Sequence, residues 1–190
     1  LAQADVRRMR TKEALEHAVD LLAVTIQEGL PLTPPQHARQ DRIGAVERLR
    51  AKVSAAKWVD PDLLREYTAL YLKELEIGNS REYFFAKIPV QDRFGTPDMI
   101  WAECVMNGNW SVYYRTIDGK HVGMYQNVAE EGAPRYDFIE ELPPPVKAEI
   151  EGTIAALRGD DYEQQIQLLL GKQQVAEYKT PLQRAYDSLR

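Results

Sequence analysis

The chain has 190 residues, of which 44% are hydrophobic and 28% are charged, and its net charge is −5. This length and composition are typical of one globular domain. No apolar run reaches the roughly 18 residues that cross a bilayer, which excludes an integral membrane segment. A single cysteine excludes an internal disulfide and a thiolate zinc site.

The first residues of the chain contain a weak indication of its cellular compartment. Ala2-Gln3-Ala4 has the small–x–small pattern of a signal-peptidase site, and the sequence contains no stretch before it with which to test this interpretation. We favour a cytoplasmic protein, with a periplasmic or secreted location as the alternative.

Residues 1–78 are predicted to be helical. The first helix covers about 4–29, and the second begins with Thr33 as N-cap and Pro34 in its first turn. The third begins with Asp60 as N-cap and ends at Gly78-Asn79. The apolar stripes of the first two helices are Leu15, Val19, Leu22 and Ile26, then Ile43, Val46, Leu49, Val53 and Ala56. Short connections make the three helices antiparallel neighbours.

Residues 79–142 are predicted to form an antiparallel sheet of three to five strands. Apolar residues alternate from Glu82 to Val90, and Pro89 indicates an edge strand. The segment 93–98 is a loop, and a short strand is expected at 136–139. Helices follow in 143–190, at about 145–158 and 160–176, with a last turn after Thr180-Pro181. The predicted fold class is α+β, most simply one compact domain.

Residues 99–125 hold the cysteine, two tryptophans and a histidine, and their strand parity can be worked out from the turns. A three-residue loop near Asn107-Gly108 gives one apolar face, consisting of Ile100, Ala102, Cys104, Trp110, Val112 and Tyr114. We prefer this frame to a two-residue loop, because the latter buries Glu103 without a partner.

The same logic at Gly119 adds Val122 and Met124 to the apolar side. The opposite, outer face then collects Trp101, Glu103, Tyr113, Arg115, His121 and Tyr125. Trp101 and Arg115 lie close enough there for cation–π contact. A face this aromatic is covered either by the flanking helices or by a partner.

Catalytic and metal-binding patterns are weak. Cys104 and His121 fall on opposite faces, so they do not form a nucleophile–base pair. Glu13, His17 and Asp20 have metal-ligand spacing, but they occupy the polar side of the first helix and no second cluster completes a site. The acidic pairs at 130–131, 140–141 and 160–161 are typical of turns and helix starts. No phosphate-binding glycine pattern is present. The sequence predicts no catalytic residue, metal or cofactor.

The leading expectation is a non-enzymatic protein-binding module, such as an adaptor, a chaperone-like subunit or a toxin-neutralising protein. Its partner would meet the outer face through Trp101, Tyr113, Arg115, His121 and Tyr125. Trp101 and Arg115 would be the anchors, because these residue types dominate interface hot spots. The partner is another protein whose identity the sequence does not give.

Two alternatives stay open. One is a nucleic-acid-associated accessory protein using the basic N-terminal helices, although acidic residues interrupt their basic ones. The other is a small-ligand binder or enzyme with a pocket between helices and sheet, lined by Tyr67, Tyr71, Trp110 and Tyr114.

Overall fold

The computed structural model describes residues 2–91 and 97–178, and within them it has the predicted α+β architecture. Three N-terminal helices precede a five-stranded antiparallel sheet, and two helices follow it. The helices are α1 (Ala2–Glu28), α2 (Arg39–Ala55), α3 (Pro61–Asn79), α4 (Pro144–Leu157) and α5 (Tyr162–Tyr178). The strands are β1 (Arg81–Gln91), β2 (Pro97–Asn107), β3 (Ser111–Thr116), β4 (Val122–Asn127) and β5 (Tyr136–Ile139).

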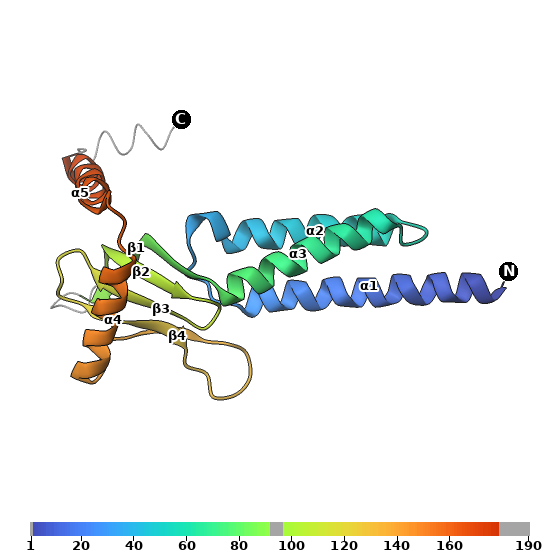
Figure 1. The fold of residues 1–190 in the computed structure, drawn as a ribbon, viewed down its shortest axis with the longest axis horizontal. Coiled ribbons are helices and arrows are strands. Elements are labelled where there is room, and N and C mark those ends of the chain that lie inside the picture. The colour runs from blue at the N-terminus through green and yellow to red at the C-terminus, as the bar shows by residue number, and fades with distance from the viewer. Residues whose placement is uncertain (1, 92–96, 179–190) are drawn as a thin grey trace.

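The three N-terminal helices form an arm that projects from the sheet (Figure 1). α1 and α3 both run toward the sheet, and α2 runs away from it. The predicted apolar stripe of α1 is buried, and it packs on buried residues of α2 and α3. These residues are Leu15, Val19, Leu22 and Ile26 of α1, Val46, Leu49 and Val53 of α2, and Leu63 of α3.

The helix boundaries are confirmed in part. Asp60 caps α3, because its Oδ1 accepts hydrogen bonds from the backbone N–H of Asp62 and Leu63, both at 2.9 Å. The predicted N-cap at Thr33 is wrong. Residues 35–37 form a short 3₁₀ helix, and α2 begins only at Arg39. The last turn predicted after Thr180 lies outside the described residues.

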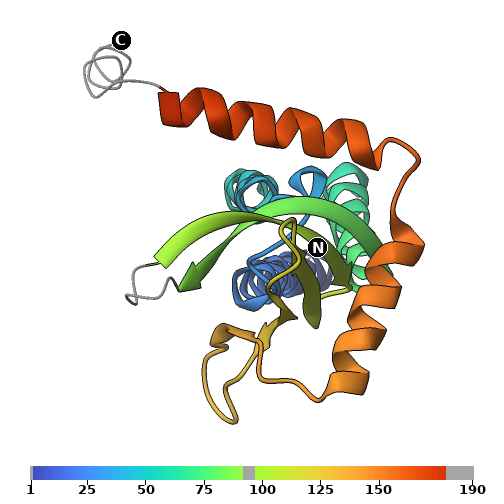
Figure 2. The ribbon, with the colours of Figure 1, turned by 90° about the vertical axis from the view of Figure 1, so that its left-hand side faces the viewer.

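The sheet is a meander with the order β1-β2-β3-β4-β5, so β1 is an edge strand, as Pro89 indicates. Its two faces have separate cores. The first face carries the apolar side of β1, β2 and β3 and packs on Ile77 of α3 and on Leu30, which follows α1. The second is covered by α4 through Ile150 and Ile154 (Figure 2). The predicted loop 93–98 falls partly outside the described residues, but Pro97 and Asp98 belong to β2.

Candidate binding surfaces

An apolar groove lies where α1, α3 and the β2–β3 turn meet, and its volume is about 490 Å³. The walls of the groove come from both helices, and the turn closes one end. The lining residues are Ala18, Leu21, Leu22 and Thr25 of α1, Tyr67, Tyr71, Glu74, Leu75, Gly78 and Asn79 of α3, and Asn109 and Trp110 of the turn. Three of the four aromatic residues expected to line a helix–sheet pocket, Tyr67, Tyr71 and Trp110, therefore meet here.

Trp110 stands at the end of this groove with 81% of its surface exposed. The prediction that it packs in the core beside Val112 is wrong, because the turn occupies Gly108, Asn109 and Trp110 and the strands pair from Asn107 and Ser111 outward. Trp110 therefore belongs to the turn. The remaining members of the predicted face, from Ala102 to Tyr114, do pack in the core.

Gly108 fixes the position of the turn against α3. Its φ of +54° is favourable for glycine, and its N–H donates to the Ser80 carbonyl at 2.8 Å. A Cβ at this position would lie 2.2 Å from the carbonyl oxygen of Gly78. Only a residue without a side chain lets the turn approach the end of α3 this closely, and this approach places Trp110 on the groove.

The groove is almost free of charge. Glu74 is the one charged side chain among its described lining, and its Oε2 accepts a hydrogen bond from Arg42 at 2.6 Å, with both side chains largely buried. Burial raises the pKa of Glu74, against the opposing effect of the Arg42 charge. Leu21 and Leu75 are 54% and 45% exposed on the two walls. The helices thus leave a large apolar surface in solvent.

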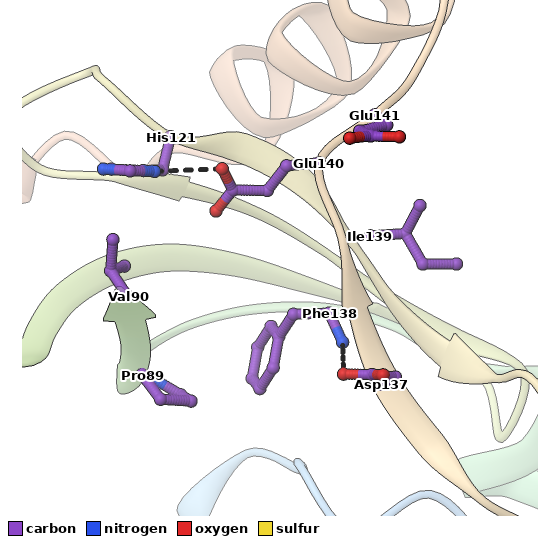
Figure 3. Close-up of a pocket in the computed structure, with 8 residues that line it drawn as sticks. All are labelled: Pro89, Val90, His121, Asp137, Phe138, Ile139, Glu140 and Glu141. Atoms are coloured by element: carbon purple, nitrogen blue, oxygen red, sulfur yellow. Dashed lines mark hydrogen bonds and ion pairs between the residues drawn. The ribbon is translucent and has the colours of Figure 1, made fainter. Parts of the chain in front are cut away.

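A second cavity, of about 580 Å³, lies between the end of β1, His121 and the segment 137–141 (Figure 3). His121 Nδ1 lies 3.0 Å from Glu140 Oε2, and Tyr114 donates from its hydroxyl to Glu140 Oε1 at 3.3 Å. Asp137 and Glu141 add further carboxylates to its lining. Glu140, expected only as a turn residue, therefore orients the imidazole of His121.

Gly123 is the reason why Tyr114 can reach Glu140. Tyr114 pairs with Gly123 across β3 and β4, and a Cβ on Gly123 would lie 2.6 Å from the Tyr114 hydroxyl. Burial, followed by the Glu140 charge, raises the pKa of Tyr114. The hydroxyl therefore stays protonated and serves as a hydrogen-bond donor.

A buried carboxylate lies on the face of the sheet that α4 covers. Glu103 is 1% exposed, and its two oxygens accept hydrogen bonds from Arg158 at 2.6 and 2.7 Å. The hydroxyls of Tyr83 and Tyr162 donate to it at 3.0 and 3.2 Å. Glu103 was predicted to face outward because a buried carboxylate needs a partner. Its outward position is wrong, because it has partners from β1 (Tyr83), from the segment joining α4 to α5 (Arg158) and from the start of α5 (Tyr162). These contacts connect the start of α5 to the sheet.

The five residues expected to form one outer face are divided by the structure. Trp101, Tyr113 and Arg115 lie on the side covered by α4, where Tyr113 packs against its core and Arg115 lies 3.6 Å from Glu151. The described cation–π contact of Trp101 is with Lys87, at 5.4 Å, rather than with Arg115. A single outer face is therefore the wrong description.

His121 and Tyr125 lie on the opposite side, where Tyr125 packs against the core of the first face. Arg115 pairs with Val122 and Tyr114 with Gly123, so β4 is shifted by one residue relative to the predicted register. Val122 and Met124 consequently face α4 and not Tyr114. His121 and Tyr125 are thereby separated from the three residues under α4.

The parity argument that separated Cys104 from His121 is also wrong, since both belong to the same side of the sheet. Cys104 is fully buried, however, and burial raises the pKa of its thiol. Its Sγ donates to the Ala102 carbonyl at 3.8 Å. A buried thiol that stays protonated is a poor nucleophile.

Several basic residues of the N-terminal helices are engaged by carboxylates. Arg50 pairs with Asp20 and Glu47, and Lys52 pairs with Glu66. Asp20, one member of the metal-spaced set on α1, is thus an ion-pair partner. Within residues 2–91 and 97–178, no group of three or more His, Cys, Asp or Glu side chains is arranged to hold a metal ion.

No helix in the described part of the chain combines the length and apolarity needed to cross a membrane. Comparisons with family models, with curated proteins and with solved structures gave no match for this chain.

Proposed function

We propose that the chain is a non-enzymatic protein-binding module that receives its partner in the groove between α1 and α3. The observation that carries the proposal is the exposed Trp110 at the end of an apolar groove whose one described charged side chain, Glu74, is paired with Arg42. Tryptophan and tyrosine supply much of the binding energy in protein interfaces, and here Trp110, Tyr67 and Tyr71 share one concave surface. Apolar surface of this kind is typical of a docking site.

The proposed surface differs from the outer face expected from the sequence. Trp101, Tyr113 and Arg115 lie beside α4, and Tyr125 contacts the opposite core. Reaching all five predicted residues at once would require a partner to contact both sides of the sheet. The groove presents its aromatic residues to one partner without any rearrangement of the chain.

Affinity capture from extracts of the native host tests the proposal. Trp110→Ala and Leu21→Glu should each reduce the amount of captured partner at least about tenfold. The first variant removes an aromatic anchor, and the second places a charge in the apolar groove. The matched control is Leu168→Glu, which alters a leucine on α5 that is 64% exposed and lies outside the groove lining. Equal recovery by the groove variants and the wild type would eliminate the groove as the binding surface.

Binding of a small ligand in the His121 cavity is the second candidate. It is favoured by the oriented His121–Glu140 pair beside Asp137 and Phe138 in a cavity of about 580 Å³. A metabolite screen should then find a compound that raises the melting temperature of the wild type. Glu140→Gln should abolish that rise, because it weakens the partner that orients the imidazole. A rise that survives Glu140→Gln would place the ligand elsewhere.

A further inference from the structure

We infer that the groove receives an amphipathic helix of a partner protein, which inserts antiparallel to α1 and α3 and completes a four-helix bundle. This inference rests on the proposed function and goes further by naming the shape, chemistry and direction of the partner segment. Four features carry it: the spacing of apolar residues, the chemistry of the walls, the concavity of the surface and the polarity of its closed end.

The first feature is a second stripe of residues on each helix, apolar except for Thr25 on α1. On α3, the exposed Leu64, Tyr71 and Leu75 lie at i, i+7 and i+11, beside the buried Leu63 and Ile77, and Tyr71 and Leu75 line the groove. On α1, Ala18, Leu21 and Thr25 lie at i, i+3 and i+7. A helix packed on one neighbour needs one stripe. Two stripes at heptad spacing are typical of a helix that packs on two neighbours.

The second feature is that both walls of the groove are helices. Their backbone N–H and C=O groups are used within each helix, so they offer no edge to an extended strand. A strand lying in the groove would leave its own backbone groups unpaired against apolar side chains. A helix forms its backbone hydrogen bonds internally and can place an apolar stripe in the groove. Such a stripe matches the lining, whose one described charged side chain, Glu74, is already paired with Arg42.

The length of the seat also fits a helix. From Tyr67 to Asn79, the part of α3 that lines the groove, the helix rises about 18 Å at 1.5 Å per residue, which corresponds to about three helical turns. A partner helix of this length would run from Trp110 toward the connection between α2 and α3, where Trp58 lies (Figure 1).

The third feature is concavity, which argues against a second copy of this chain as the occupant. A symmetric dimer would place the groove of one copy against the groove of the other. Two concave surfaces leave the space between them unfilled, whereas a convex helix from another protein fills it.

The fourth feature sets the direction of the partner helix. α1 and α3 both end near the sheet (Figure 1), so the negative ends of two helix dipoles lie toward the end of the groove that the β2–β3 turn closes. Asn109 lines this end, and its Oδ1, which is buried, has no hydrogen-bond partner among the described residues. The first turn of a helix carries unpaired N–H donors and a partial positive charge. The N-terminus of the partner helix therefore belongs at the Trp110 end.

Two synthetic peptides of roughly 18 residues test the shape of the occupant. Both contain the same leucines, alanines, glutamines and lysines. One has its leucines at heptad spacing, and the other has them at alternate positions. The heptad peptide should bind at least about tenfold more tightly and gain helical circular dichroism on binding. Trp110→Ala and Leu21→Glu should remove this advantage, and Leu168→Glu should preserve it.

The outcomes separate this inference from the proposed function. If the alternating peptide binds equally well or better, or if neither peptide binds, a helix is the wrong occupant. The groove would still be the binding surface if affinity capture of the partner depends on Trp110. If the heptad peptide binds equally to the wild type and to both groove variants, the groove itself is wrong. Sedimentation of a dimer that Leu21→Glu converts to a monomer would overturn the inference in favour of a second copy.

Fluorescence quenching tests the direction. In a Trp58→Phe, Trp101→Phe protein, Trp110 is the only tryptophan, and in a Trp101→Phe, Trp110→Phe protein only Trp58 remains. A nitroxide at the N-terminus of the heptad peptide should quench Trp110 more strongly than one at its C-terminus, and the order should reverse for Trp58. The opposite pattern would contradict the proposed direction.

Discussion

Single residues determine the positions of the exposed Trp110 and the buried Glu103. Gly108 lets the β2–β3 turn touch the end of α3, and this contact exposes Trp110 on the groove. Arg158 donates two hydrogen bonds to Glu103, which lies buried on one face of the sheet. Both effects depend on contacts between distant segments of the chain.

Replacing Gly108 should be costly. Gly108→Ala should lower the free energy of unfolding by about 1–3 kcal/mol for the positive φ, and by more because of the contact with Gly78. The matched control is Gly132→Ala, where φ is +83° but a Cβ would meet nothing within 4 Å. Urea denaturation measures both. Equal losses for the two variants would show that the close approach at Gly108 has no energetic weight.

Removing the partner of Glu103 should also destabilise the fold. Arg158→Met leaves a carboxylate that is 1% exposed without its cation, and we expect a loss of about 3 kcal/mol in the free energy of unfolding. The double variant Glu103→Gln, Arg158→Met should recover part of this loss. The control, Arg65→Met, removes an ion pair with Asp62 on the surface and should change little. A loss no larger than that of the control would contradict the role assigned to Arg158.

At the scale of elements, periodicity predicted most of the architecture. The stripe of α1, the Asp60 cap and the edge position of β1 follow from local sequence, because helix and strand periods are set by near neighbours. The exact positions of the turns were harder to predict from the sequence. One residue more or less in a turn exchanges the two faces of the following strand. This shift places Tyr125 and His121 on the other side of the sheet from the one predicted.

The candidate site was harder to predict than the fold. Tyr67, Tyr71 and Trp110 could be expected together in a pocket only by analogy with other sheets packed on helices. Trp110 was expected to reach it from the core face of a strand, and its actual place in the turn depends on the contact of Gly108 with Gly78. The partners of Glu103 include a residue 55 positions away in the chain, and the sequence contains no local signal for such a pair.

The β3–β4 turn should show a pH dependence. The Thr116 hydroxyl donates to Asp118 Oδ1 at 2.6 Å, and this bond, against the opposing effect of burial, lowers the pKa of Asp118 from its ordinary 3.8. Because the folded-state pKa lies below the unfolded one, the stabilisation is complete above 3.8 and is lost as the pH falls through the folded-state value.

Asp118→Asn provides the measurement of this effect. The wild type should be more stable than the variant near neutral pH, and the difference should shrink as the pH falls below about 4. Urea denaturation at several pH values records the gap. A gap that stays constant or widens toward acid would contradict the assigned pKa shift.

The whole molecule joins a helical arm to a curved sheet, and the groove lies where the two meet (Figure 1). The arm buries its first apolar stripe among its own helices and leaves the second exposed. The faces of the sheet have their own cores, one against Ile77 of α3 and Leu30, and one under α4. We therefore propose the apolar groove with Trp110 as the surface that receives a partner protein.

Site-specific photo-cross-linking in the native host tests this account most directly. A photoreactive amino acid at Leu21 and, separately, at Leu75 places one probe on each wall of the groove, and Leu168 on α5 provides the control position. The account predicts that both groove positions form an adduct with the same partner polypeptide and that Leu168 does not. An adduct with that partner at Leu168, with none at Leu21 and Leu75, would contradict it.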